Sequence, residues 1–262
     1  MMFTLTIIFF VFGLIIGSFL NVVIIRLNTQ KSFGGRSGCM VCMNQLTWYE
    51  LVPVFSYLFL RGRCKNCKTK ISIQYPLVEL VTGIIFAVLF FKFQNVFFLD
   101  TLKFSFTYAY YAVMFSLLVV IATYDLKHKI IPDTLSLFLG ILAFMGLFFF
   151  DANNSFQFHL HIPSLLDFLS GIVMSAFFAF FWLVSRGAWM GLGDAKLSFG
   201  LGWLLGFSMM LSGLVISFWI GAIFGIALVI FSKKHGMKSE IPFAPYLVLG
   251  TLIAFIFELH IF

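Results

Sequence analysis

The segment LSFGLGWLLGFSMMLSGLVISFWIGAIFGIALVIF, residues 197–231, contains no charged residue. A single helix over this segment would be about 52 Å long at 1.5 Å per residue, whereas the hydrocarbon core of a bilayer is about 30 Å thick. The segment is nevertheless short for two full crossings. Small residues cluster in its first half and favour a break near Gly206: Gly200, Gly202, Gly206 and Ser208. We therefore predict a short helix over residues 195–205 and a longer one over residues 209–231.

Six further apolar runs are candidate membrane spans: residues 3–25, 77–93, 104–123, 135–150, 165–184 and 243–262. Hydrophobic residues make up 61% of the 262 residues and charged residues only 10%, which is too little charge to cover the surface of a soluble domain. The first run is too long for a signal-peptide core, and no small-residue cleavage site follows it. The sequence therefore predicts an all-α polytopic membrane protein with about eight transmembrane helices.

The basic residues support this count and predict an orientation. With eight helices and the loop after residue 25 inside, 15 of the 17 Lys and Arg lie on the inner side, and only Lys92 and Lys103 lie outside. Cytoplasmic loops carry such an excess of Lys and Arg. We therefore expect both termini outside, and we attribute the net charge of +7 to membrane orientation rather than to nucleic-acid binding.

The one long polar excursion, residues 26–75, contains two Cys-x-x-Cys pairs, Cys39 with Cys42 and Cys64 with Cys67. Each pair can direct two thiolates at one centre, and four thiolates form the tetrahedral shell that zinc prefers. A segment of about 50 residues buries little core, so a structural metal would stabilise it. The alternatives are four free thiols or a redox pair. We predict a zinc-ribbon-like insert on the cytoplasmic side.

Two acidic residues stand at the predicted cytoplasmic membrane edge, Asp125 after the third predicted helix and Asp194 at the start of the short sixth helix. An acid at the hydrocarbon boundary is costly unless it has a partner or a function. Two close carboxyls cannot both ionise easily, so one can hold a proton while the other activates water. Gly191 and Gly193 would let a substrate backbone approach Asp194. Alternatively, Asp125 is an ordinary interfacial charge, and we interpret Asp133 as a helix N-cap.

Short motifs follow one another along nearly the whole chain, and their order is more specific than any one of them. They are Gly17-Ser18-Phe19-Leu20-Asn21, the two Cys-x-x-Cys pairs, Arg61-Gly62-Arg63-Cys64, Tyr75-Pro76-Leu77-Val78-Glu79, Asp125 with Ile131-Pro132-Asp133, Gly191-x-Gly193-Asp194-x-Lys196 and Ile241-Pro242-Phe243-Ala244-Pro245-Tyr246. With this series the chain resembles the type IV prepilin peptidase family, the bifunctional prepilin leader peptidase/N-methyltransferases. It departs from the family pattern at Met40, where proline is usual, and at Ala244, where glycine is usual.

The resemblance implies two reactions. Asp125 and Asp194 carry over as the aspartic pair that cleaves the basic leader from type IV prepilins or pseudopilins. The second reaction methylates the new N-terminal amine with S-adenosylmethionine as the donor, which the family assigns to the N-terminal cytoplasmic region. Five residues are candidates for the substrate and methyl-donor region: Asn21, Glu79, Gly191, Gly193 and Lys196. For Asn21 and Glu79, helix packing or capping is the alternative.

The resemblance also implies a place and a set of partners. We expect a multi-pass protein of the bacterial inner membrane with its active site at the cytoplasmic edge, partnered by lipid and by pilin-like substrates and not by nucleic acid. We expect three parts: a first helix (1–25), a four-cysteine insert that holds structural zinc (26–75) and a membrane peptidase domain (76–262). The rival hypotheses are a peptidase without methyltransferase activity, and a transporter or assembly scaffold that uses the aspartates as a proton relay.

Overall fold

The computed structural model describes residues 2–29, 32, 34–151, 154–231 and 241–260. Within these residues it is all-helical, with eight α-helices and one short 3-10 helix, η1 (Trp48–Glu50). The chain forms two compact units, Met1–Gln94 and Asn95–Phe262. Each unit is described by itself.

In the first unit, α1 (Met2–Arg26) packs closely on the first part of α3 (Gln74–Leu99). A Cβ atom added to Gly13 would lie 2.8 Å from the Gly83 Cα atom, and one added to Gly17 would lie 2.7 Å from the Glu79 Cα atom. Any larger side chain would push the two backbones apart. The Gly-x-x-x-Gly spacing in α1 therefore permits close helix packing, as such spacings do in membrane helices. The polar segment between the two helices carries η1 and the short α2 (Phe55–Phe59).

The helices α3 and α4 are longer than the apolar runs 77–93 and 104–123 that predicted them. The helix α3 begins at Gln74, and α4 (Thr101–His128) follows it after the single residue Asp100. The Asp100 carboxylate accepts hydrogen bonds from the N–H groups of Leu102 and Lys103, both at 3.0 Å, and so caps α4. Hydropathy marks only the apolar part of a helix, whereas polar caps extend the helix beyond that part.

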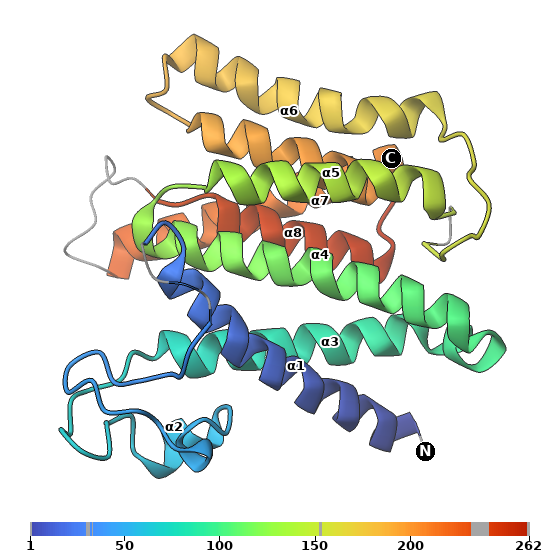
Figure 1. Ribbon diagram of the computed structural model, residues 1–262. Helices are drawn as coiled ribbons and strands as arrows, with labels where there is room; N and C mark the ends of the chain where they lie inside the picture. The colour runs from blue at the N-terminus through green and yellow to red at the C-terminus, as the bar shows by residue number, and fades with distance from the viewer. Residues whose placement is uncertain (1, 30–31, 33, 152–153, 232–240, 261–262) are drawn as a thin grey trace. The chain divides into compact units, whose positions relative to one another are not determined.

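The second unit is a bundle of α4, α5 (Asp133–Phe149), α6 (Leu165–Ser185), α7 (Leu192–Phe231) and α8 (Ala244–Phe257), which run side by side in Figure 1. The helix α7 contacts α5, α6 and α8, and α4 contacts α5 and α8. The α6–α7 contact is especially close, because a Cβ atom on Gly202 would lie 2.6 Å from the Gly171 Cα atom. Since α7 touches three neighbours, its first turn is held in a fixed place.

The predicted break in the long apolar segment is confirmed. Gly206 has φ 69° and ψ 171°, which lies outside the helical region and favours glycine. The Phe207 N–H, which would otherwise lack a partner at a restarting helix, donates to Asp167 Oδ1 at 3.0 Å. Helix α7 begins at Leu192, three positions before the predicted start. Asp167 therefore stabilises the break.

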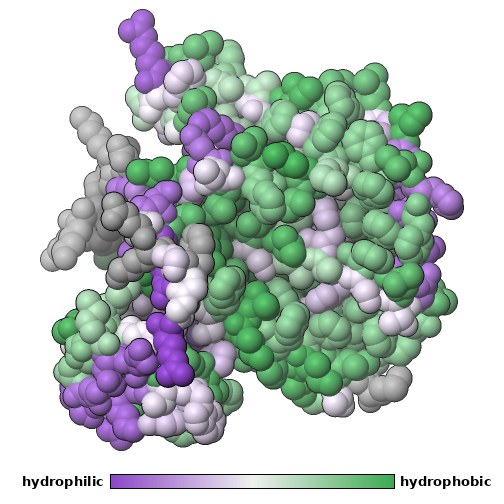
Figure 2. Space-filling model, in the orientation of Figure 1, coloured by the Kyte–Doolittle hydropathy of each residue, from purple (hydrophilic) through white to green (hydrophobic). Residues whose placement is uncertain are grey.

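Among the described residues, five helices are long and apolar enough to cross a membrane: α1, α3, α4, α6 and α7. The apolar helices α5 and α8 are shorter, and α8 ends at Phe257 rather than at residue 262, the last two residues lying outside the described ones. With α7 counted as two segments, these helices correspond to the eight predicted ones. Apolar residues cover the helix sides that face the viewer in Figure 2. The chain is an all-helical integral membrane protein.

Candidate functional site

The cysteine segment of the first unit is built from two turns with the same hydrogen bonds. The Cys39 N–H donates to Asn44 O at 3.0 Å, and the Cys64 N–H donates to Thr69 O at 2.9 Å. The residue after the second cysteine is left-handed in both turns: Met43 (φ 56°) and Lys68 (φ 59°). The two Cys-x-x-Cys sequences therefore fold locally into matching turns.

The four sulfur atoms meet at one point, as the spacing predicts. They all lie within 4.8 Å of one another, with Cys39 Sγ 3.7 Å from Cys67 Sγ and Cys42 Sγ 4.0 Å from Cys64 Sγ. Thiolates about 2.3 Å from a tetrahedral zinc ion are about 3.8 Å apart, so these separations fit one metal. All four cysteines are free thiols. The cluster could hold a metal ion.

The surroundings of Cys67 favour the form that binds metal. Its sulfur lies 3.3 Å from the Thr69 hydroxyl. Hydrogen bonding from this hydroxyl, and after it from the Thr69 backbone amide, lowers the pKa of the Cys67 thiol to about 6. The thiolate is the form of cysteine that ligates metals. Cys67 therefore offers a ready ligand at neutral pH.

In the second unit, Asp125 lies within the last turn of α4 and is only 4% exposed. The prediction that it follows the helix is wrong, because α4 continues to His128 and closes through the left-handed Lys129, whose N–H donates to Asp125 O at 2.7 Å. The Asp125 carboxylate accepts a hydrogen bond at 3.2 Å from the N–H of Ala244, the first residue of α8. An N–H in the first turn of a helix has no partner within that helix, so it is available to this acid.

The contribution of Ala244 was missed because a backbone donor carries no side-chain signal. From the sequence, Ala244 is only a departure from the usual glycine. The one available signal was the pair Pro242 and Pro245, since proline near the first helical position marks a helix start and hence its unused N–H groups.

Asp194 lies in the first turn of α7 and is 7% exposed. The two glycines before it differ in their surroundings. A Cβ atom on Gly193 would lie 3.1 Å from the Ile131 Cβ atom, so this position is tightly packed. A Cβ atom on Gly191 would meet the Asp194 carboxylate at an ordinary 3.7 Å. Of the two glycines, only Gly191 leaves space beside the acid.

The structure brings Asp125 and Asp194 together. They are 69 positions apart in the chain, yet both are buried and their carboxylates are close enough to interact electrostatically. Because α4 and α7 belong to the same bundle, packing of the bundle sets this approach. A pair of buried acids can share one proton and can activate a water molecule between them.

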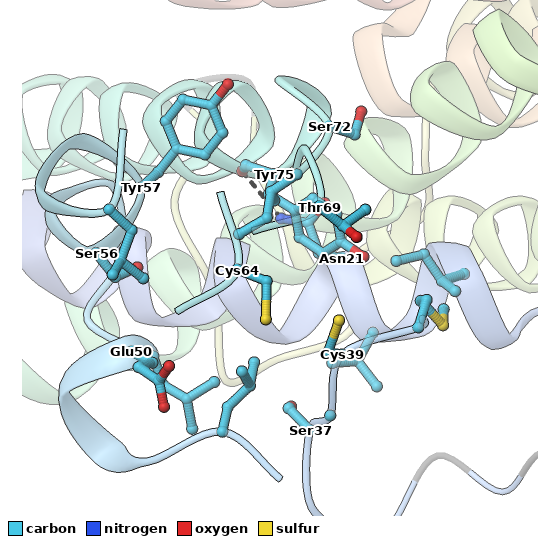
Figure 3. Close-up of a pocket in the computed structure, with 18 of the residues that line it drawn as sticks. Asn21, Ser37, Cys39, Glu50, Ser56, Tyr57, Cys64, Thr69, Ser72 and Tyr75 are labelled. Atoms are coloured by element: carbon cyan, nitrogen blue, oxygen red, sulfur yellow. Dashed lines mark hydrogen bonds between the residues drawn. The ribbon is translucent and has the colours of Figure 1, made fainter. Parts of the chain in front are cut away.

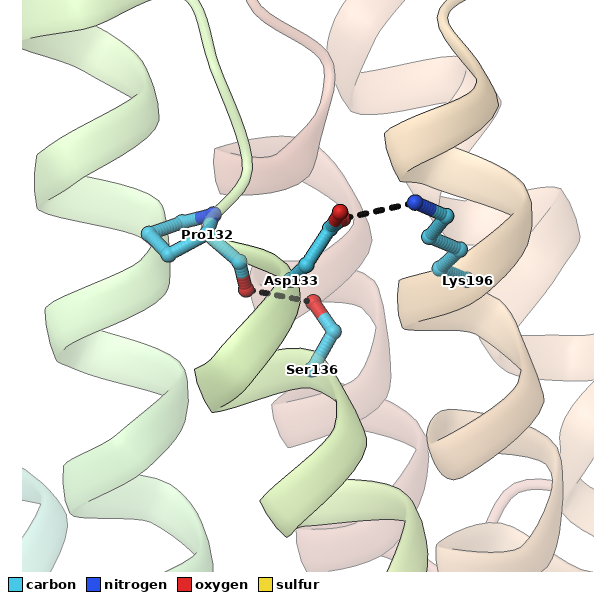
Figure 4. Close-up of polar contacts among 4 residues, drawn as sticks. All are labelled: Pro132, Asp133, Ser136 and Lys196. Carbon is cyan, nitrogen blue, oxygen red and sulfur yellow. Dashed lines mark hydrogen bonds and ion pairs between the residues drawn. The ribbon is translucent and has the colours of Figure 1, made fainter.

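An ion pair joins α5 to α7 (Figure 4). The Lys196 Nζ atom lies 2.7 Å from Asp133 Oδ1, and the side chains are 44% and 71% exposed. The prediction of Asp133 as an N-cap is wrong: the N-cap of α5 is Pro132, and no side chain caps this helix. The carboxylate instead pairs with the ammonium group, and so links the start of α5 to the turn that carries Asp194.

The remaining predicted site residues are divided between the units. Asn21 on α1 and Glu79 on α3 belong to the first unit and are 1% and 7% exposed. Gly191, Gly193 and Lys196 belong to the second. The five residues predicted for the substrate and methyl-donor region therefore do not all belong to the same unit.

The second unit is a helical membrane bundle in which two buried aspartates approach each other. The first unit holds four clustered cysteines. These two features define the class of the protein: a membrane protein with an acid pair and a four-thiol centre. Residues 11–93 match the bacterial peptidase A24 N-terminal domain, and residues 112–226 match the type IV leader peptidase family. The chain belongs to the type IV leader peptidase family.

Several curated proteins, each named prepilin leader peptidase/N-methyltransferase, are similar to the chain. The protein from Bacillus subtilis is 32% identical over 95% of this chain and 93% of its own length. The protein from Xanthomonas campestris pv. campestris is 31% identical over 93% of this chain and 88% of its own length. The protein from Myxococcus xanthus is 36% identical over 88% of this chain, and the match spans 65% of that protein. No solved structure matches the chain.

Proposed function

We propose that this protein removes the leader peptide from type IV prepilins or pseudopilins and then methylates the new N-terminal amine. The observation that carries the proposal is the approach of Asp125 and Asp194, two buried acids that interact electrostatically within one helix bundle. The relatives named for both reactions match over most of the chain. Membership of a peptidase family and the acid pair support the same hydrolytic reaction.

In the hydrolysis that we propose, the two acids share one proton. The charged carboxylate removes a proton from a water molecule, and the water oxygen attacks the carbonyl carbon of the scissile peptide bond. The neutral carboxyl donates its proton to the carbonyl oxygen, which gives a tetrahedral diol. The acid that took the proton from water then donates it to the leaving nitrogen, the C–N bond breaks, and the other carboxylate takes a proton from a diol hydroxyl as the new carboxyl group forms. The Ala244 N–H fixes one oxygen of Asp125, and the space beside Gly191 leaves room for a substrate backbone. Asp125 and Asp194 are thus the catalytic residues of the proposal.

The proposed location is the cytoplasmic edge of the inner membrane. Both acids lie near the ends of apolar helices, Asp125 in the last turn of α4 and Asp194 in the first turn of α7. The excess of Lys and Arg in the loops on this side favours a cytoplasmic position. A prepilin that keeps its basic leader inside would place its cleavage point at the same level.

The proposed metal of the cysteine cluster is structural zinc. Four thiolates that surround one tetrahedral ion leave no open coordination position, so the metal would stabilise the segment rather than react. Cys39, Cys42, Cys64 and Cys67 would hold it. For the second reaction, S-adenosylmethionine would supply an electrophilic methyl group, and the substrate amine would lose a proton as it becomes methylated.

The test uses the purified full-length protein with a prepilin embedded in lipid vesicles and methyl-labelled S-adenosylmethionine. We expect removal of the leader and transfer of label to the new N-terminal residue. Asp125→Asn and Asp194→Asn should each abolish cleavage, whereas Asp133→Asn, the same change at a neighbouring exposed acid, should retain it. Near-normal cleavage by either of the first two variants would exclude the acid pair. Cleavage without labelling would identify a peptidase only, and no cleavage by the unaltered protein would favour the proton-relay alternative.

A further inference from the structure

The first unit contains a cavity of about 620 Å³ (Figure 3). Its walls come from the second half of α1, the two cysteine turns, the segment around α2 and the first turns of α3. Small-molecule sites have volumes of roughly 300–1,000 Å³ and combine apolar walls with a few polar groups. The cavity is large enough for a nucleoside-sized ligand, and all its lining residues belong to one unit.

One wall of this cavity carries a buried acceptor without a donor. Asn21 is 1% exposed, and its Nδ2 group donates to Tyr75 O at 3.0 Å, the bond drawn in Figure 3, and to Gly17 O at 3.3 Å. These two bonds fix the amide. Among the described residues, no group donates to Asn21 Oδ1. Buried polar atoms in folded proteins nearly always have a partner, so this oxygen points to a ligand donor.

A buried carboxylate lies on the same wall. Glu79 is 7% exposed and lies one helical turn after Tyr75. Its Oε2 atom accepts a hydrogen bond at 2.7 Å from the Val54 N–H, and the Ser18 side chain also hydrogen-bonds to this carboxylate. In the described part of the chain, no Lys, Arg or His forms an ion pair with it. A buried carboxylate without a cation is costly, and a cationic ligand would remove that cost.

The backbone around Val54 indicates that Glu79 is held in place. Val54 has φ 62° and ψ −49°, a positive-φ conformation outside the left-handed helical region that is unusual for a β-branched residue. Such conformations persist only where the surrounding structure holds them, and they concentrate at functional sites. Here the strained N–H faces Glu79. One carboxylate oxygen of Glu79 is thereby fixed.

The rest of the cavity is suited to other parts of one ligand. Tyr57 and Tyr75 supply aromatic rings that suit a flat base or a cationic centre. Basic side chains on the lining can pair with a carboxylate: Arg26, Arg36, Lys65 and Lys70. A ligand with a cationic centre, a carboxylate and a flat base satisfies all three features, and S-adenosylmethionine has all three.

We propose that this cavity binds S-adenosylmethionine, with Asn21 Oδ1 and the Glu79 carboxylate receiving its cationic methionine portion. The inference rests on the proposed methyl-transfer function and assigns that function a site. The ammonium group of a newly cleaved substrate is the competing occupant, because it too is a cation with N–H donors. The juxtaposition that carries the proposal is an amide oxygen without a donor among the described residues and a buried carboxylate with no ion-pair partner among them, on one wall of one cavity.

The experiment measures binding of labelled S-adenosylmethionine to the full-length, zinc-loaded protein without prepilin. Glu79→Gln removes the charge but keeps an oxygen for the Val54 N–H, and we expect the Kd to rise at least tenfold. The matched control is Glu50→Gln, the same change at the other carboxylate on the cavity lining, whose oxygen is already bonded to Thr47. Its Kd should change less than twofold. Zinc content should stay unchanged in both variants.

The outcomes separate this inference from the proposed function. If Glu79→Gln binds the donor within twofold of the unaltered protein, the cavity assignment is overturned while methyl transfer stands. An unaltered protein that neither binds the donor nor methylates overturns both. Should Glu79→Gln lose zinc and fail to fold, ultraviolet crosslinking of labelled S-adenosylmethionine to the unaltered protein decides. Label on Tyr57 or Tyr75 supports the cavity, and label only outside residues 18–79 overturns it.

Discussion

The cysteine cluster and the acid pair bring distant residues together in different ways. Each half of the cluster is a turn of six residues, closed by its own backbone hydrogen bonds. The acid pair has no such local geometry, because Asp125 and Asp194 meet only when α4 and α7 pack in one bundle. With the proposed zinc, a metal would join the two local turns of the cluster, whereas the acid pair depends on burial among helices.

The two regions also differ in how much apolar surface they bury. Around the cysteines, large side chains are exposed, with Trp48 80% and Phe59 84% exposed. Around the acids, neighbours such as Ile121, Leu197 and Leu201 are fully buried. A segment with little core loses its fold with its metal, whereas a packed bundle retains its fold when one polar group changes.

The largest effect is expected at the acid pair. Asp125→Asn or Asp194→Asn should reduce leader cleavage by about 10³-fold or more, because the hydrolysis needs both a proton acceptor and a proton donor. The double variant should be no slower than either single one, since residues that act as a unit are not additive. Single-turnover cleavage of a prepilin measures the rates, and zinc content and S-adenosylmethionine binding should be unaffected. A double variant that is much slower than both single variants would contradict the shared role.

A smaller but still large effect is expected from loss of the metal. Cys64→Ser should lower zinc content from about one ion per chain to near zero, because three thiolates bind far more weakly than four. Limited proteolysis should then cut within residues 26–75 while the helices of the second unit resist. The control is Met40→Ser, a change at an exposed position inside the first turn that leaves all four thiols. Equal protease resistance with and without zinc would show that the segment folds without metal.

An intermediate effect is expected at Gly193. In Gly193→Ala the new Cβ atom would lie 3.1 Å from the Ile131 Cβ atom, so the first turn of α7 must move by a few tenths of an ångström. We expect cleavage to fall about tenfold, because small misplacements of catalytic groups are costly. Gly191→Ala, whose Cβ atom meets only ordinary contacts, should leave the stability of the protein unchanged. If thermal unfolding and cleavage of Gly193→Ala match those of the unaltered protein, the packing argument fails.

The smallest effect is expected at the ion pair between α5 and α7. Lys196→Met should reduce cleavage less than tenfold, since exposed ion pairs contribute roughly 0–1 kcal/mol. Lys196→Arg should restore most of the loss, and high salt should lower the activity of the unaltered protein toward that of Lys196→Met. A double-mutant cycle with Asp133→Asn gives the coupling energy. A coupling of zero would mean that Lys196 acts on the substrate rather than on Asp133.

The sequence by itself determined which segments are helices, and it located the break at Gly206. Both follow from local chemistry. In lipid, the backbone N–H and C=O groups of an apolar run must form their hydrogen bonds within a helix. A run that is too long for one crossing must break, and it breaks where glycine allows a non-helical conformation. The convergence of the four cysteines was also predictable, because each Cys-x-x-Cys turn contains its own geometry. Helix ends were not, since Asp100 and Lys129 extend α4 by capping, and hydropathy does not record caps.

Only the tertiary structure decided which polar groups form hydrogen bonds or ion pairs with one another. That the Ala244 N–H reaches Asp125, that Lys196 pairs with Asp133, and that Asn21 Oδ1 is left with no donor among the described residues are all results of helix packing. A sequence gives the type of each side chain and its position along a helix. The partner of a buried polar group depends on which helix packs against it, and this depends on contacts between residues far apart in the chain.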